Sequence, residues 1–442
     1  MQEWLHMTAC DLGRAIAQGR IDPVDLTEAY LAAIDAHPLR DRIYARVTHD
    51  RARSEARAAQ ERAKAGRRRS LLDGVPISWK DLFDTAGIGT EAGSALLAGR
   101  VPEQDAPVVA AATAAGLVCL GKTHMSELAF SGLGWNPVTQ TPPCVNNENA
   151  VPGGSSSGAA ASVAFGLAAA GIGSDTGGSV RIPSVWNDLV GLKTTSGRLS
   201  LEGVVPLCLR FDTIGPLCRS VEDATHLLAA MEGTRAADLG GASLAGRRMA
   251  VLRTVVMDDL QPEPAAAFDS AVDALRKTGV AIEEISVPAL NDALAVSGPL
   301  FAGEAYGLWR DVIEAQPDVM FPRILDRFRS GNAFSAPDYV AAWAKLDAAR
   351  AQWDAATAGF DAVLCPTAPN LPPDLQRLAE DDEYYASENL RTLRNTRVGN
   401  VMGLCAVTLP AGVASCGLML MGKPDGEEAL LRLAVAAEQA LT

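Results

Sequence analysis

The stretch Gly173-Ser174-Asp175-Thr176-Gly177-Gly178-Ser179 is the most informative part of this chain of 442 residues. It follows the small apolar run 168–172 and places a serine directly behind two glycines. Adjacent glycines allow the backbone to bend so that several N–H groups point at one spot. Such a loop suits an oxyanion hole with Ser179 as the nucleophile beside it. Glycine and serine are also common in ordinary turns, so this hypothesis depends on other motifs.

Two upstream segments supply the groups that a serine nucleophile needs. They are residues 152–158 (PGGSSSG) and 74–81 (GVPISWKD). A serine attacks poorly until a base removes its proton, and a lysine can do this only when it is neutral. The ordinary pKa of lysine is about 10.4, so the pKa of Lys80 would have to fall by about three units, which burial favours. Lys80, Ser155 and Ser179 are therefore a candidate relay. The alternative for Lys80 is a surface ion pair with the aspartate that follows it.

Two other catalytic motifs are disfavoured. Residues 154–158 fit the G-x-S-x-G pattern of serine hydrolases, with Ser156 as the nucleophile. That motif needs an apolar strand before it and a histidine well downstream. Residues 146–152 are polar and end in proline, and the only later histidine is His226. A phosphate-binding P-loop is disfavoured because no G-K-[ST] follows the glycines.

The composition disfavours several other classes of protein. A formal net charge of −14 opposes binding to nucleic acid or to an anionic membrane surface. None of the eight cysteines forms a C-x-x-C pair, so we expect buried free thiols in a reducing compartment. The five histidines lack the spacing of zinc ligands, and we expect no metal. The N-terminus does not resemble a signal peptide, and the longest apolar run, 158–173, is shorter than the about 20 residues of a membrane span. We therefore expect a cytoplasmic protein.

Strand-like and helix-like segments alternate along the chain, which is typical of an α/β fold with a buried sheet. Asp22-Pro23 predicts the start of a helix. Residues 74–78 are expected to form a strand that enters a loop at 79–81, and the serines at 155–157 are expected to cap the next helix. Residues 135–152 are predicted to be a long loop. Other helices are predicted at 50–66, 108–115, 265–278, much of 300–360 and 427–441, and other strands at 116–120, 168–172, 246–251, 280–287, 360–365 and 405–410.

The motifs together resemble those of the amidase signature family. Residues 74–81, 152–158, 173–183, 190–195 and 214–223 occur in that family's order, and the two serines are separated as in its motif. The resemblance extends through 361–367 and 409–412 but is loose between about 225 and 355. It implies a single domain over 1–442 with a large twisted mixed β-sheet covered by helices on both faces. It also implies a motif-bearing core at about 60–225 and a variable region at about 225–400 that shapes the substrate site.

The family resemblance implies a Ser–cis-Ser–Lys triad that hydrolyses a small-molecule carboxamide through an acyl-enzyme. By position, Ser179 is similar to the nucleophile, Ser155 to the bridging serine on a cis peptide bond, and Lys80 to the base. No metal or organic cofactor is implied. The expected partner is the small amide substrate, without nucleic acid or membrane, and association into a homodimer is left open.

The same resemblance assigns roles to the glycine-rich loop. The backbone N–H groups of Thr176, Gly177 and Gly178, with that of the nucleophile itself, would bind the oxyanion. Asp175 and Arg181 match family positions that brace the loop, and we interpret them as structural support.

Departures from the family pattern leave the substrate undetermined. Ser157 replaces the usual fifth residue of G-G-S-S-G-G, and Thr194 replaces a common proline. One alternative function is the glutaminase component of a tRNA-dependent amidotransferase. Another is a catalytically silent binding protein, which the intact Lys80, Ser155 and Ser179 argue against.

Four aromatic residues are candidates for the wall of an acyl pocket, with packing in the core as the alternative. They are Trp135, Phe301, Tyr306 and Trp309, and of the two interpretations the sequence favours core packing.

Overall fold

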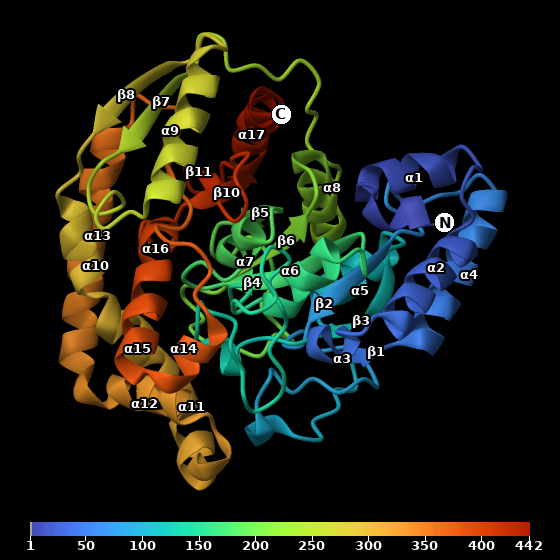
Figure 1. The fold of residues 1–442 in the computed structure, drawn as a ribbon, viewed down its shortest axis with the longest axis horizontal. Coiled ribbons are helices and arrows are strands. Elements are labelled where there is room, and N and C mark those ends of the chain that lie inside the picture. The colour runs from blue at the N-terminus through green and yellow to red at the C-terminus, as the bar shows by residue number, and fades with distance from the viewer. Residues whose placement is uncertain (1) are drawn as a thin grey trace.

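Eleven strands form one β-sheet in the computed structural model, which describes residues 2–442 (Figure 1). Most of the strands are short, apolar and buried on both faces, as in sheets that are covered by helices. The strands are β1 (Tyr44–Val47), β2 (Pro76–Lys80), β3 (Val118–Thr123), β4 (Ala170–Asp175), β5 (Val190–Lys193), β6 (Thr213–Cys218), β7 (Arg248–Leu252), β8 (Ala281–Ile285), β9 (Ala362–Pro366), β10 (Cys405–Pro410) and β11 (Gly417–Gly422).

The sheet is mixed, as the family resemblance implies. Its strand order is β1-β3-β2-β4-β6-β5-β10-β11-β9-β7-β8. Strand β2 pairs in parallel with both β3 and β4, and β7 pairs in parallel with β8 and β9. The remaining neighbours are antiparallel. The parallel trio β3-β2-β4 brings the ends of β2 and β4 to one edge, where the candidate catalytic residues lie.

Helices cover both faces of the sheet. The second helix begins where the sequence predicts, because the Asp22 carboxylate accepts a hydrogen bond from the Val24 N–H and proline occupies the first turn. The α-helices are α1 (Ala9–Ala17), α2 (Pro23–Ala36), α3 (Arg40–Ile43), α4 (His49–Lys64), α5 (Pro107–Ala114), α6 (Ser157–Ala164), α7 (Arg181–Trp186), α8 (Val221–Glu232), α9 (Pro262–Arg276), α10 (Ala289–Ala295), α11 (Glu304–Ala315), α12 (Pro322–Arg329), α13 (Ala336–Thr357), α14 (Leu375–Glu380), α15 (Asp382–Thr392), α16 (Arg394–Val401) and α17 (Glu427–Leu441). Short 3-10 or π segments occupy Gln2–His6, Ala95–Leu97, Glu127–Ala129, Gly298–Gly303, Pro317–Val319 and Ser330–Ala333.

The helices divide into groups with different positions. Helix α6 packs on β2, β4 and β6, and α7 packs on β5 and β10, whereas α8, α9 and α17 contact the sheet and α17 contacts both of the others. Helices α10 to α16 gather on the side of the molecule opposite α1, α2 and α4 (Figure 1). Within residues 2–442, no helix is long and apolar enough to cross a membrane. All eight cysteines are buried and free, as predicted.

The structure corrects the expected end of the second strand. Strand β2 continues through Trp79 and ends at Lys80, whereas the sequence predicted a loop at 79–81. Both residues stay in the strand because they pair with Lys122 and Thr123 of β3. Lys80 is therefore held by a sheet and not by a loop.

The three serines at 155–157 do not cap α6, contrary to expectation. The N-cap residue is Ser156, and no side chain bonds the first N–H groups of the helix. The Ser156 hydroxyl instead bonds the backbone of Ser174, and the Ser157 hydroxyl donates to the carbonyl of His124. The Ser155 hydroxyl accepts a hydrogen bond from a lysine. These serines tie the helix start to the neighbouring strands.

Candidate active site

Lys80 lies at the end of β2, fully buried. Its Nζ donates to Ser155 Oγ at 2.7 Å and to Ser174 Oγ at 2.8 Å. Burial lowers its pKa to about 7, although the negative charges of Asp212 and Asp175 act in the opposite direction. A lysine with this pKa is substantially uncharged near neutral pH, so it can accept a proton.

Ser155 and Ser179 lie on two loops that are joined through the backbone. The peptide bond between Gly154 and Ser155 is cis, as the family resemblance implies. The N–H of Ser156 donates to the carbonyl of Ser179 at 3.2 Å. Within residues 2–442, the Ser179 hydroxyl makes no hydrogen bond to Ser155 or to any other group, and it faces a cavity. The structure thus contains the link from lysine to the first serine but not the link between the two serines.

The turn that presents Ser179 requires glycine. Gly178 has a φ of +140°, and a Cβ there would lie 2.1 Å from Thr396 Oγ1. At Gly177 a Cβ would meet no atom within 4 Å, because that position borders the cavity. The two glycines therefore serve different purposes. Gly178 allows close packing against α16, and Gly177 leaves space in front of Ser179.

Asp175 and Arg181 support this turn from the interior of the protein, and both are fully buried. Arg181 donates two hydrogen bonds to the Asp175 carboxylate, at 2.8 and 3.0 Å, and others to Thr396 O and Asn400 Oδ1. The same carboxylate accepts hydrogen bonds from the N–H groups of Gly178 and Val180. Burial alone would raise the pKa of Asp175, but the Arg181 guanidinium holds it well below its usual range. These contacts fix the backbone of the turn that carries Ser179.

The N–H groups of the loop are not equivalent. That of Gly178 is bound to Asp175 Oδ1 at 2.9 Å, so it is not free for an oxyanion as the sequence had suggested. Within the described chain, those of Thr176, Gly177 and Ser179 have no acceptor, and these same three residues line the cavity.

Asp212 is a buried acid beside the loop that sequence reasoning missed. Its carboxylate accepts the hydroxyl of Thr176 and the N–H groups of Leu207 and Cys208. Burial raises its pKa to about 6, while the bond from Thr176 and the charge of Lys80 act to lower it. The site therefore contains a buried acid and a buried lysine, each of which influences the pKa of the other through its charge.

The cavity in front of Ser179 has a volume of about 840 Å³. Its lining decides the alternatives for the four aromatic residues: Trp135 and Phe301 line it, whereas Tyr306 and Trp309 do not. The Trp309 Nε1 donates instead to a backbone carbonyl at 2.8 Å, in the core. A cavity of this size suits a small organic ligand.

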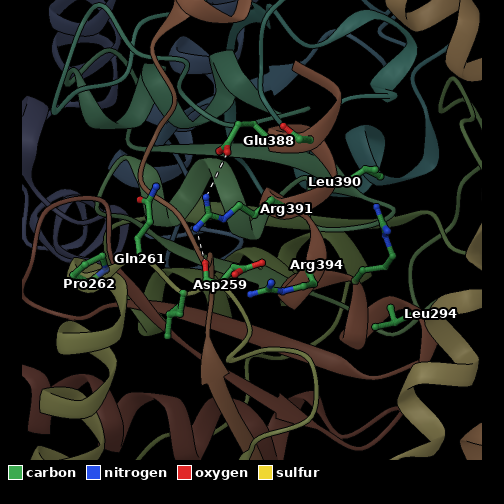
Figure 2. Close-up of a pocket in the computed structure, with 11 residues that line it drawn as sticks. Asp259, Gln261, Pro262, Leu294, Glu388, Leu390, Arg391 and Arg394 are labelled. Carbon is green, nitrogen blue, oxygen red and sulfur yellow. Dashed lines mark hydrogen bonds and ion pairs between the residues drawn. The ribbon is translucent and has the colours of Figure 1, made fainter. Parts of the chain in front are cut away.

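A second cavity, of about 870 Å³, lies alongside and is drawn in Figure 2. It shares Leu390 and Arg397 with the first cavity but contains none of the predicted catalytic residues. Arg391 crosses it, bonded to the Glu388 carboxylate and to the backbone carbonyl of Asp259 (Figure 2).

One cluster in the described chain has the composition of a metal site, although the sequence gave no such spacing. Potential ligand atoms of Cys10, Glu222 and His226 lie within 4.8 Å of one another. The Glu222 carboxylate already accepts two hydrogen bonds from Arg14, at 2.8 and 3.0 Å. An ion pair therefore accounts for this carboxylate.

A family model described as Amidase matches residues 25–431. The chain belongs to the amidase family. The 2-amino-5-chloromuconic acid deaminase of Comamonas testosteroni is 35% identical over 399 residues, which cover 88% of this chain and 86% of that protein. The A-type subunit of glutamyl-tRNA(Gln) amidotransferase from Chloroflexus aurantiacus is 31% identical over 479 residues, covering 99% and 97%. The structure of native peptide amidase from Stenotrophomonas maltophilia matches with a TM-score of 0.86 and 26% identity, covering 100% of this chain and 98% of that one.

The family motifs contain most of the candidate site residues. Two residues that contact them, Ser174 and Asp212, were not identified because their local sequence does not indicate this contact. Ser174 lies in the glycine-rich stretch 173–179, and its contact with Lys80 depends on the parallel pairing of β2 and β4. Asp212 precedes β6, which the sequence did not predict as a strand, since residues 214–223 were recognised only as a family motif. Knowledge that β4 and β6 are adjacent would have placed this acid beside Thr176.

Proposed function

We propose that this amidase-family protein hydrolyses a small-molecule carboxamide, with Ser179 as the nucleophile, Ser155 as the proton relay and Lys80 as the base. The observation that carries this proposal is the 2.7 Å hydrogen bond from Lys80 Nζ to Ser155 Oγ at a buried lysine whose pKa is lowered to about 7. A buried base of this kind, beside a serine that opens onto a cavity, suits proton abstraction during acyl transfer.

In the first half of the reaction, Ser179 Oγ attacks the amide carbon. Its proton passes to Ser155, whose own proton passes to Lys80, so the lysine becomes charged as the tetrahedral intermediate forms. The two serine hydroxyls must come into hydrogen-bonding contact for this step, and such contacts are often long before substrate binds. The C–N bond then breaks, and the relay returns the proton to the leaving amine.

In the second half, water attacks the Ser179 ester. The relay removes a proton from this water, and the acyl C–O bond breaks to release the acid and restore the serine hydroxyl. The N–H groups of Thr176, Gly177 and Ser179 are suited to stabilise the oxyanion in both halves because they border the cavity without an acceptor of their own. The N–H of Gly178, which donates to Asp175 Oδ1, would instead hold the loop in position.

A second candidate function is the glutaminase step of a tRNA-dependent amidotransferase. The observation that favours it is the 31% identity to the A-type subunit of such an enzyme over 99% of this chain. The relative named as a deaminase of 2-amino-5-chloromuconic acid is 35% identical and favours a small-molecule substrate. If the purified chain releases ammonia from glutamine only when amidotransferase partner proteins are added, the second function is correct.

A fluorophosphonate probe tests the proposed nucleophile independently of the substrate. We expect the folded protein to be labelled at Ser179, as located by peptide mass spectrometry, and to release ammonia from members of a panel of carboxamides. The Ser179→Ala variant should show neither. If folded wild-type protein remains unlabelled at Ser179, the proposal is wrong and a silent binding protein becomes the better description.

A further inference from the structure

Two arginine side chains face the catalytic cavity without a counter-ion. Arg327 lies on α12 and Arg397 on α16, and both line the cavity that contains Ser179. Within residues 2–442, neither guanidinium has a hydrogen-bond or ion-pair partner. Arg327 rests on the ring of Phe130, with its Cζ 4.6 Å from the ring centroid. A guanidinium stays protonated in proteins, so both groups carry charge.

Two nearby arginines, in contrast, have charged partners. Arg323, one turn before Arg327 on the same helix, donates to the carbonyl of Ala379 at 3.2 Å and forms an ion pair with Asp382. Arg391 is bound to Glu388 and to a backbone carbonyl, as Figure 2 shows. The chain thus supplies a carboxylate for Arg323 and for Arg391, but none for Arg327 or Arg397.

The unpartnered pair is energetically unfavourable in the free protein. Burial lowers the pKa of both groups, and the charge of Arg327 adds to this at Arg397, whose pKa falls to about 10. The two like charges are therefore close enough to repel each other in a partly desolvated site. A buried charge is costly unless it is paired, and an anion placed between two guanidinium groups would remove this cost.

We infer that the substrate is an amide that carries a carboxylate, held by Arg327 and Arg397 while its carboxamide lies at Ser179. This inference rests on the proposed amide hydrolysis and names its substrate class. Guanidinium groups match carboxylate oxygens in shape and can bind them with two parallel hydrogen bonds. The cavity of about 840 Å³ reaches from the serine to both arginines, so one molecule can contact all three.

The charges on the lining favour one carboxylate over a more highly charged group. The Arg323–Asp382 pair is neutral as a unit. Of the remaining charged residues that line the cavity, Arg327 and Arg397 are positive and the exposed Asp326 is negative. The surplus is one positive charge, which a single carboxylate neutralises.

Matched pairs of amides test this inference. Each monoamide of a dicarboxylic acid, from malonamate to adipamate, is compared with its methyl ester, which has the same chain without the charge. We expect wild-type protein to prefer the acid in at least one pair, by about 100-fold in kcat/KM. The chain length that gives the largest preference then measures the reach from Ser179 to the arginines.

Variants assign the preference to the two arginines. In Arg327→Gln and in Arg397→Gln, the ratio of kcat/KM between the acid and its ester should fall by about 10-fold or more. Arg329→Gln is the matched control, because Arg329 lies on the same helix but is exposed and paired with Glu314 at 2.7 Å. Its ratio should equal that of wild type. A wild-type preference for the ester, or an unchanged ratio in both cavity variants, would overturn the inference.

A binding measurement separates failure of this inference from failure of the proposed reaction. Glutarate should raise the Tm of Ser179→Ala protein, and it should do so less after Arg327→Gln is added. If Ser179 is labelled by a fluorophosphonate but glutarate has no effect and neutral amides are preferred, the hydrolase is correct and the carboxylate subsite is wrong. If Ser179 is not labelled but glutarate binds through the arginines, the carboxylate subsite is correct and the proposed hydrolysis is wrong.

Discussion

Two regions border the same cavity and differ in how their polar groups are satisfied. The catalytic floor, formed by Lys80, Ser155 and the loop 175–179, comes from β2, β4 and the start of α6. Here the titratable side chains have partners: Lys80 bonds two serine hydroxyls, and the Asp175 carboxylate bonds Arg181. The helical wall, formed by α12, α15 and α16, instead presents two arginines without partners.

This difference indicates that the two regions have different tasks. The titratable groups of the floor are held by hydrogen bonds, while the N–H groups of Thr176, Gly177 and Ser179 are left free at the cavity. Such a preorganised arrangement is what stabilisation of a transition state requires. A wall with unpaired charge is incomplete until a ligand supplies the missing group. We therefore expect changes in the floor to act on kcat, and changes in the wall to act on KM and on the choice of substrate.

Replacement of the nucleophile should have the largest effect. Ser179→Ala removes the atom that is proposed to form the acyl-enzyme, so we expect kcat to fall by about 10⁴-fold or more with an unchanged Tm. Ser200→Ala is the control, since Ser200 is exposed and its hydroxyl only accepts a local backbone N–H. Steady-state kinetics and thermal denaturation of both variants provide the measurement. Activity of Ser179→Ala near that of wild type would exclude the assignment.

Lys80 can be compared with a second buried lysine. Lys193 is also fully buried with its pKa lowered to about 8, but its Nζ donates to the carbonyls of Thr194 and Leu404. Lys80→Met should lower kcat by about 10³-fold and leave Tm at or above that of wild type, because it removes a base that is costly to charge. Lys193→Met should lower Tm and keep kcat within about tenfold.

The reverse pattern for the two lysines would contradict the proposed base. If Lys193→Met lost activity without loss of Tm while Lys80→Met remained active, the proton acceptor would have to be sought on β5. Circular dichroism of both variants would verify that the sheet is retained.

The pH dependence should follow the charge on Lys80. The base must be neutral, and its pKa is about 7, so kcat/KM should rise about tenfold per pH unit below 7 and level off above it. Because the negative charge of Asp212 raises the pKa of Lys80, Asp212→Asn should move this rise to lower pH. A rise that begins only near pH 10, or one that Asp212→Asn moves upward, would contradict the role of Lys80.

Much of the floor could be predicted because its residues lie in short segments with distinctive local sequence. The strand at 405–410 and the helix at 427–441 also have their predicted bounds, since a short apolar run and a periodic apolar face mark them directly. Strand β11 was missed: its run Gly417–Gly422 is flanked by glycines and gains its pairing only from β9 and β10. Strand formation of this kind depends on neighbours across the sheet.

The wall could not be predicted from local sequence. Arg327 and Arg397 are 70 positions apart in the chain, and only the packing of α12 and α16 around the cavity brings them together. An arginine on an amphipathic helix is usually solvated or paired, as Arg329 is. The informative property is the lack of a partner, and this is defined only once the whole fold is known.

Two tryptophans, one in the cavity wall and one in the core, allow a direct comparison in which the expected effects are the smallest. Trp135 lines the cavity and lies 4.9 Å from the Cζ of Arg323, measured to its ring centroid, whereas Trp309 is buried and bonded to a carbonyl. Trp135→Phe should raise KM by about three- to tenfold and keep kcat within about twofold, because it loosens contact with the substrate but not the relay. Trp309→Phe should leave KM unchanged and lower Tm, because it leaves a carbonyl unpaired and a small cavity in the core. If Trp135→Phe reduced kcat and left KM unchanged, floor and wall would not be separable, and substrate choice would have to lie in the catalytic loop itself.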